Sequence, residues 1–336
     1  MRVLVVAAMT HLPGHLGAGS ARAFAELGCE VQVHDYLRFH DDPLWKLGNR
    51  ARLRCRLLAR LLYPPRRREL LDAVRRFRPD LLFVISGEVF DLDTIARLRA
   101  LGVRTVLWTG DDPYQRGREL VAAPAYDRVY VFDPWYIPVL RANGVREPGY
   151  LPMAVDPSLY RPIDVSAAER ARFGGEVCFV GTYYPNRDEL LHDLRDFPLR
   201  IWGGGWPLAV ARPWHPLRQL YCGRAFGEDV VRIYCAHRAV INIQHPQSRM
   251  GQNMRTFEAP ACKSLTFTEW TAELPRLFRV DEEIIAYDSL GTLRGKLRHY
   301  LDHPDEAERI AAAGMRRART DHTYTQRMRQ VLEEIA

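Results

Sequence analysis

Residues 250–268 read MGQNMRTFEAPACKSLTFT, a polar cluster that passes through a short helical segment into an apolar, β-prone run. This order predicts a helix whose first turn faces a ligand and which leads into a buried strand over 264–267. The first N–H groups of a helix lack partners and the helix dipole is positive there, so this end attracts anions. Arg255 can donate paired hydrogen bonds to phosphate oxygens, and Glu258 can accept hydrogen bonds from sugar hydroxyls. The stretch therefore predicts a nucleoside-diphosphate site, with Arg255 for phosphate and Glu258 for ribose.

The first half of the chain alternates apolar runs with helical patterns. Its first run, Val3 to Ala8, is continuously apolar, as expected for a strand buried on both faces. Further strands are expected over 31–34, 81–85, 104–108, 128–132 and 147–150, and helices over about 20–27, 46–77, 91–101 and 134–143. This alternation predicts a parallel sheet in a doubly wound domain.

Prolines and a glycine pair interrupt the alternation between residues 151 and 175, which predicts an interdomain linker. The alternation then resumes. Strands are expected over 177–180, 199–202, 239–243, 264–267 and 284–287, and helices over 187–196, 228–236, 253–262, 289–301, 304–318 and 323–335. The sequence thus predicts an α/β protein with two Rossmann-like, doubly wound domains.

The length of 336 residues is sufficient for two cores, and we place the domains at 1–160 and 161–319. No apolar run approaches the roughly 20 residues of a membrane span. The N-terminal Val-Leu-Val-Val is interpreted as a buried strand rather than a signal peptide. The six cysteines are scattered without C-x-x-C spacing, which argues against a zinc site and favours a reducing, cytoplasmic location.

The net charge of +7 is concentrated in the arginine-rich region 50–78. One interpretation is a patch for peripheral contact with an anionic membrane or with a phosphorylated acceptor. The alternative is a helix with a solvated arginine face. Nucleic acid is not expected as a partner, because neither interleaved aromatic residues nor a DNA-binding motif accompanies the charge.

Glycines end two of the strands predicted in the second half, at Gly181 and Gly203. Ligands of parallel sheets bind at the carboxyl ends of strands, and a glycine there lets the backbone approach a diphosphate. Arg187 and His245 follow strands at the same predicted edge. The alternatives are a strand-to-helix turn with Arg187 in a surface ion pair, ordinary turn chemistry at Gly203, and an exposed loop histidine.

The loop after the first strand carries His11, His15, Gly17 and Gly19. A histidine there has a pKa near neutrality and can serve as the base that deprotonates an acceptor hydroxyl. The alternative is a flexible polar loop. Position 22 is an arginine, so the fingerprint Gly-x-Gly-x-x-Gly is absent, and a dinucleotide-dependent oxidoreductase is disfavoured.

Acidic side chains follow two further strands of the first half. Asp111 and Asp112 precede Pro113, and Glu88 follows the strand expected at 81–85. The aspartates can hydrogen-bond acceptor hydroxyls, act as the catalytic base or bind a metal. Alternatively, they cap a helix that begins at Pro113. Glu88 faces the same predicted cleft.

Seven segments, taken in order, resemble GT-B glycosyltransferases, and most of all their bacterial CgeB-like branch (spore maturation protein CgeB, glycosyltransferase family 1-like). They are RPDLLFVISGE (78–88), TVLWTGDDP (105–113), YDRVYVFD (126–133), YLPMAVDPSLYRP (150–162), CFVGTYYPNR (178–187), the stretch 250–268 and DHTYTQR (321–327). The resemblance covers nearly the whole chain. It implies the GT-B fold, in which two Rossmann-like domains face a cleft and a C-terminal helix, here at about 320–336, crosses back onto the first domain.

The resemblance also implies a glycosyltransferase that moves a sugar from a nucleoside-diphosphate sugar to an acceptor hydroxyl on a glycan, a lipid-linked molecule, a protein or a small molecule. The nucleotide sugar is a co-substrate, and neither a further cofactor nor a metal is expected, since GT-B enzymes generally need no metal for chemistry. The candidate residues fall into three groups. They are the donor-binding Glu258, Arg255, Asn253, Gly181, Arg187, Gly203, His245 and Lys263, the acceptor-side Gly17 and Glu88, and the catalytic candidates Asp111, Asp112, His15 and His11.

The chain departs from its relatives at two positions. Met250 stands where many retaining enzymes have the first of two glutamates, and Lys263 stands where the CgeB-like pattern usually has glycine. These departures put a retaining reaction in question and keep open a non-catalytic module that binds nucleotide or glycan. A GT-B sugar-nucleotide epimerase is a separate alternative to the transferase. The sequence does not decide the donor base, the sugar, the acceptor, the stereochemistry or the oligomeric state.

Overall fold

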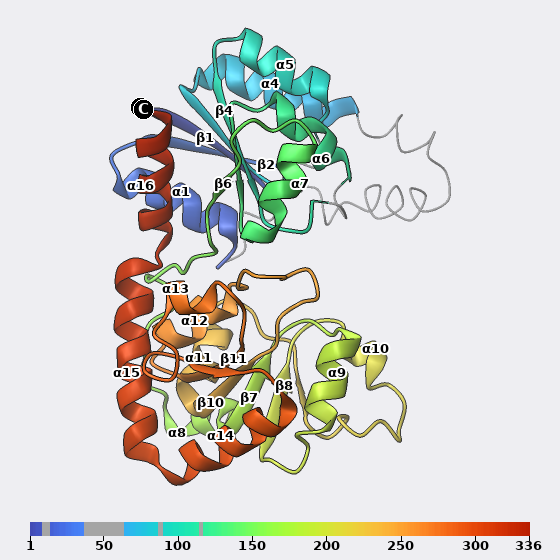
Figure 1. Cartoon of the computed structure of the whole chain (residues 1–336), viewed down its shortest axis with the longest axis vertical. Coiled ribbons are helices and arrows are strands. Elements are labelled where there is room, and N and C mark those ends of the chain that lie inside the picture. Colours follow the sequence, from blue (N-terminus) through green and yellow to red (C-terminus); the bar gives the residue numbers. More distant parts are fainter. Residues whose placement is uncertain (9–13, 37–63, 87–89, 114–116) are drawn as a thin grey trace. The chain divides into compact units, whose positions relative to one another are not determined.

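The computed structural model describes residues 1–8, 14–36, 64–86, 90–113 and 117–336. These residues form two units, each with its own parallel sheet (Figure 1). The first unit comprises Met1–Pro152 and Tyr324–Ala336, and the second comprises Met153–Thr323. The sequence places the boundaries near 160 and 320. Its assignment of acceptor binding to the first domain and donor binding to the second stays a prediction.

The first unit contains six parallel strands in the order β2-β1-β3-β4-β5-β6. They are β1 (Arg2–Ala7), β2 (Glu30–Asp35), β3 (Leu81–Ile85), β4 (Arg104–Thr109), β5 (Arg128–Val131) and β6 (Gly149–Tyr150). The first strand is central, because Val3 pairs with Val31 on one side and with Leu81 on the other. Every residue of β3 is buried, as the continuous apolar run predicts for a strand covered on both faces.

The helices of this unit are α1 (Leu16–Glu26), α4 (Pro64–Phe77), α5 (Leu92–Ala100), α6 (Gly117–Ala122), α7 (Ile137–Ala142) and α16 (Tyr324–Ile335). The sequence predicts a basic helical region over 46–77 that breaks near Pro64, and α4 begins at this proline. Proline fits the first turn of a helix, where its missing N–H needs no partner. Residues 46–63, and with them much of the arginine-rich region 50–78, lie outside the described residues.

The C-terminal helix α16 returns to the first unit and packs on α1, as the resemblance implies (Figure 1). The Tyr324 ring lies so near the backbone of Gly19 that a Cβ there would sit 2.5 Å from it. At the other end of α16, Glu334 forms an ion pair with Arg128 and accepts a hydrogen bond of 2.9 Å from the Tyr130 hydroxyl. A small residue in α1 and a terminal charge pair therefore fix this helix on its unit.

The second unit also has six parallel strands, in the order β12-β11-β10-β7-β8-β9. They are β7 (Gly175–Val180), β8 (Leu199–Trp202), β9 (Tyr221–Gly223), β10 (His237–Asn242), β11 (Leu265–Glu269) and β12 (Ile285–Tyr287). The sequence predicts five of these strands. It misses β9, a three-residue edge strand that ends in a glycine and is too short for a periodic pattern. The two sheets confirm the predicted α/β architecture.

The helices of the second unit are α8 (Ala167–Phe173), α9 (Pro185–His192), α10 (Trp206–Ala209), α11 (Glu228–Ala236), α12 (Arg255–Ala261), α13 (Leu274–Leu277), α14 (Leu290–Asp302) and α15 (Pro304–Asp321). The first of them lies within 151–175, where the sequence predicts only a linker. A capping box begins it: the Ser166 hydroxyl accepts from the Glu169 N–H at 3.3 Å, and the Glu169 carboxylate accepts from the Ser166 N–H at 3.0 Å. The Ser-x-x-Glu signal for this helix is present in the sequence.

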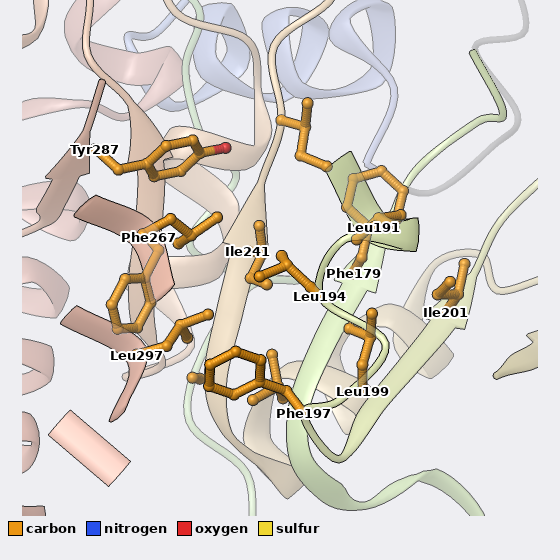
Figure 2. Close-up of a cluster of buried hydrophobic side chains, with 14 of the residues drawn as sticks. Phe179, Leu191, Leu194, Phe197, Leu199, Ile201, Ile241, Phe267, Tyr287 and Leu297 are labelled. Carbon is orange, nitrogen blue, oxygen red and sulfur yellow. The ribbon is translucent and has the colours of Figure 1, made fainter. Parts of the chain in front are cut away.

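Strands and helices of the second unit share one apolar core (Figure 2). Phe179, Ile241 and Phe267 come from three neighbouring strands, and Leu191 of α9 and Leu297 of α14 belong to the same cluster. All five side chains are at most 1 % exposed. Full burial of such a side chain stabilises the fold by about 1.5–3 kcal/mol, so this cluster is the main determinant of the unit's stability.

Two helical glycines allow a paired test of backbone packing. A Cβ on Gly314 of α15 would lie 2.1 Å from the Glu283 carbonyl oxygen, whereas a Cβ on Gly295 of α14 would meet no atom within 4 Å. We expect Gly314→Ala to destabilise the chain by about 1–3 kcal/mol through overpacking. Gly295→Ala should stabilise it by about 0.5–1 kcal/mol, because alanine is the better helix former. Urea unfolding of both variants measures the difference, and shifts of the same sign would contradict it.

The residue after α12 supplies a second test. Lys263 has φ of +62°, a left-handed conformation in which a side chain is strained, and its amine forms an exposed ion pair with Glu308. Lys263→Gly should raise the free energy of unfolding by about 0.5–1 kcal/mol, since the relieved strain exceeds the loss of a surface pair. Lys263→Ala removes the pair and keeps the strain, so it should not stabilise. Equal effects of the two substitutions in urea unfolding would refute this account.

Candidate functional site

The order of strands in the second sheet reverses between β7 and β10, which are neighbours in space although β8 and β9 lie between them in sequence. Loops that leave two such strands run in opposite directions and leave a crevice at the carboxyl edge, where α/β proteins bind ligands. Gly181 follows β7, and Gln244 and His245 follow β10. The topology therefore brings these residues to one edge.

Arg187 of α9 spans this crevice. Its side chain donates from Nη1 to the Thr182 carbonyl at 2.8 Å and from Nη2 to the Ile243 carbonyl at 2.9 Å, so it joins the loops after β7 and β10. Burial and the nearby charge of Arg255 lower the pKa of Arg187 to about 10. The residue is 8 % exposed. The alternative of a surface ion pair is thus wrong: the guanidinium is buried and donates to backbone carbonyls at the carboxyl edge of the sheet.

Arg255 and Glu258 form an ion pair on the first turns of α12, with 2.7 Å between Nη1 and Oε2. The Arg255 side chain is 31 % exposed and that of Glu258 is 2 % exposed, so the arginine covers the carboxylate. A second contact, 3.3 Å from Arg255 Nε to the Val180 carbonyl, ties the pair to the end of β7. Burial alone would lower the pKa of Arg255, but the Glu258 carboxylate raises it above its ordinary value.

Two tyrosines from other elements surround this pair. Burial, together with the charge of Glu258, raises the pKa of Tyr160 well above its ordinary value. Burial likewise raises the pKa of Tyr234, although the charge of Arg255 opposes the rise. The Tyr234 hydroxyl has no hydrogen-bond partner among the residues that the structure describes. Both side chains stay neutral and enclose the ion pair in a site of low polarity, which strengthens it.

A network of buried amides and hydroxyls lies behind the ion pair. Asn253 donates to Asn242 Oδ1 at 3.0 Å and accepts from the Arg255 N–H at 2.9 Å, which fixes the start of α12. Gln244 donates to Gln252 Oε1 at 2.6 Å and accepts from the Asn253 N–H at 3.0 Å. The same network includes Thr256, Thr268 and Glu269, which the sequence analysis does not single out.

Two glycines lie in close contact at the carboxyl ends of β7 and β8. Gly203, after β8, has φ of +141°, and a Cβ there would lie 1.9 Å from the Gly181 carbonyl oxygen. That oxygen accepts a hydrogen bond of 2.9 Å from Trp206 Nε1. His245 packs edge-on against Tyr184, with 4.3 Å between ring centroids. The two predicted glycines are therefore adjacent, and neither tolerates a side chain in this arrangement.

Lys263 lies elsewhere. It follows the last turn of α12 and precedes β11, so it lies at the amino edge of the sheet, where it pairs with Glu308. The structure does not bring it together with Arg255, which begins the same helix at the carboxyl edge.

The first sheet has its own reversal of strand order, between β1 and β3. His15 follows β1 and caps α1 by accepting the Gly17 N–H at 3.4 Å, and Asp111 and Asp112 follow β4. One strand, β3, separates β1 from β4, so the carboxyl ends of β1 and β4 lie about 10 Å apart along the edge. His11 and Glu88 lie outside the described residues.

Within the described ranges, no group of three or more histidine, cysteine, aspartate or glutamate side chains could hold a metal ion. Nor does the described part of the chain contain a helix with the length and hydropathy to cross a bilayer.

Comparisons with known proteins agree with this architecture. A family model described as glycosyl transferase-like matches residues 187–333. The spore protein CgeB of Bacillus subtilis (strain 168) is 22 % identical over 262 residues, which cover 73 % of this chain and 79 % of CgeB.

Solved structures share the fold over the whole chain. A sucrose-phosphate synthase from Thermosynechococcus elongatus superposes with a TM-score of 0.69 at 13 % identity, covering 100 % of this chain and 99 % of its own. Anabaena HepE in complex with UDP-glucose gives a TM-score of 0.68 at 12 % identity, with the same two coverages. The resemblance predicted from the sequence is thereby confirmed: the chain is similar to CgeB and shares the GT-B fold of these solved structures.

Proposed function

We propose that this chain transfers a sugar from a nucleoside-diphosphate sugar to an acceptor hydroxyl. The observation that carries the proposal is the Arg255–Glu258 pair at the reversal point of the second sheet, held by a buried polar network. A partly exposed guanidinium beside a crevice fits the chemistry of a diphosphate. The glycosyl transferase-like family match and the likeness to CgeB support the same class of reaction.

In this proposal the diphosphate binds against Arg255. Its guanidinium points one donor at Glu258 and another at the end of β7, so its orientation is set before a ligand arrives. A cation positioned in advance stabilises the charge that develops on a leaving diphosphate. Arg187 contributes its positive charge behind the loop of Gly181 while its donors hold the backbone. The glycine contact at Gly181 and Gly203 leaves backbone, with no side chain, at the carboxyl ends of β7 and β8.

Glu258 has two candidate roles. The resemblance implies that it accepts hydrogen bonds from the ribose hydroxyls. In the structure its carboxylate is buried and bonded to Arg255, so it also orients the guanidinium. The two roles make different predictions for a nucleotide that lacks the 2′-hydroxyl.

We further propose that the donor is a uridine diphosphate sugar, because HepE, which shares the fold, is described in complex with UDP-glucose. Asp111, Asp112 or His15 of the first unit would take the proton of the acceptor hydroxyl if the reaction inverts the anomeric centre. If it retains that centre, the leaving diphosphate would assist. The residues proposed for these steps do not require a metal.

Arg255→Lys tests the phosphate contact, because it keeps the charge beside Glu258 and loses the forked geometry. We expect UDP at 100 times its dissociation constant to stabilise the wild type by about 2.7 kcal/mol, which raises the melting temperature of the second unit by roughly 5–11 °C. The variant should bind UDP about tenfold more weakly or worse. Calorimetric titration and thermal shift with UDP, GDP, ADP, CDP and dTDP measure both effects.

Arg279→Lys is the matched control. Arg279 also pairs with a buried glutamate, Glu283, at 2.9 Å, but this pair precedes β12 at the other edge of the sheet. It should leave UDP binding unchanged. If no nucleotide shifts the melting temperature, the donor site is wrong. Binding that turns over neither with acceptors nor by epimerisation would indicate the non-catalytic module, and epimerised donor would indicate the epimerase.

The role of Glu258 follows from comparing UDP with its 2′-deoxy analogue. If Glu258 contacts the ribose, the wild type should bind UDP roughly tenfold more tightly than the analogue, and Glu258→Gln should lose this preference. If Glu258 acts only through Arg255, the substitution should weaken both ligands equally. Glu283→Gln is the control that keeps the preference intact.

A further inference from the structure

The chain between β8 and α11 contains α10 and then β9, the edge strand of the second sheet. Its middle part is fixed at several points: Trp206, Val210 and Leu217 all belong to the apolar core of the unit. Backbone hydrogen bonds from His215 to Arg212 and from Arg218 to His215 add turns between these anchors. The segment 206–217 is therefore ordered on the surface of the unit, because its own apolar residues pack into the core.

Two large apolar side chains of this segment point away from that core. Leu208 is 89 % exposed and Trp214 is 76 % exposed, the highest values among the exposed large apolar residues of the described chain. Single exposed apolar residues are common on proteins, but a leucine and a tryptophan exposed to this degree within seven residues are not explained by packing. Phe226, beyond β9, is 64 % exposed.

The charged residues within this part of the sequence have one sign. Residues 197–227 contain no aspartate or glutamate and four arginines. Arg200 is occupied, because it donates to the carbonyls of Gly174 and Arg172. The other three are exposed and form no ion pair with a residue that the structure describes; they are Arg212, Arg218 and Arg224.

A neighbouring acid reaches the segment at one point. Asp188 of α9 lies 3.4 Å from His215 Nε2, and both side chains are largely buried. This contact holds the segment on the unit and leaves the positive charge of the arginines uncompensated.

We propose that this surface, formed by Leu208, Trp214, Arg212, Arg218 and Arg224, docks on an anionic lipid bilayer. Tryptophan and leucine insert at the boundary of headgroups and acyl chains, and each nearby arginine gains from the negative surface potential. The combination favours a bilayer over nucleic acid, which would use the charge but not an exposed leucine. The inference does not rest on the proposed function. It also concerns a different part of the chain from the arginine-rich region 50–78.

Vesicle co-sedimentation of the full chain tests the proposal. Vesicles of phosphatidylglycerol mixed with phosphatidylcholine are compared with pure phosphatidylcholine, at low and at high salt. We expect binding to the anionic vesicles that weakens at high salt, because salt screens the attraction between the arginines and the lipid headgroups. The double variant Leu208→Ser, Trp214→Ser should lower the vesicle affinity at least tenfold. Arg212→Gln with Arg218→Gln should reduce it and remove most of its salt dependence.

The matched control is Leu92→Ser with Val121→Ser, which removes apolar residues that are 48 % and 63 % exposed in the first unit. It should bind vesicles like the wild type. Three results would overturn the proposal: no binding of the wild type to anionic vesicles, binding unaffected by lipid charge, or binding that the Leu208/Trp214 variant retains in full. Self-association in sedimentation velocity that this variant abolishes, without vesicle binding, would assign the surface to a second copy of the chain instead.

Discussion

The second unit is organised around a buried carboxylate. Glu258 is almost fully withdrawn from solvent, and an isolated charge in that position would be strongly destabilising. Arg255, three residues earlier on the same helix, compensates it, and Arg255 is in turn held by the Val180 carbonyl at the end of β7. Removing Arg255 would leave the buried Glu258 carboxylate without compensation, a loss of about 3–5 kcal/mol. The short helix α12 is thus locked to the sheet edge by electrostatics as well as by packing.

The need to hold α12 at the sheet edge also explains why buried amide side chains surround the start of this helix. A seven-residue helix is too short to be stable from its own hydrogen bonds, and no side chain of its N-cap residue, Met254, caps it. Asn253 replaces the cap by accepting the Arg255 N–H, and Asn242 and Gln244 fix Asn253 in turn. Buried amides of this kind stabilise only when their donors and acceptors are satisfied, so the network specifies one arrangement of the edge.

The sequence predicts the main strands because parallel strands buried on both faces are continuous apolar runs, as at β1 and β3. It misses β9, α10 and α13, which are three or four residues long and carry no period, and the seven-residue α8, which it includes in the linker. It finds Arg255, Glu258 and Asn253 because they are neighbours in one stretch. Tyr160 and Glu269 have no such local signal. Glu269 joins the site from β11, which the strand order places beside β10, and Tyr160 joins it from the chain before α8.

Lys263 has a backbone conformation that favours glycine. The resemblance implies a glycine at this position, and the backbone conformation offers a physical reason: the chain after α12 turns into the left-handed region, which glycine enters without strain. The lysine at position 263 therefore affects the backbone conformation at the amino edge of the sheet. Lys263 lies at the C-terminal end of α12, whose first residue is Arg255. Strain at Lys263 therefore lowers the stability of this helix. Met250 and Lys263, the two positions at which the sequence departs from the resembling pattern, lie at opposite edges of the sheet. Met250 precedes the polar network at the carboxyl edge, and Lys263 follows α12 at the amino edge.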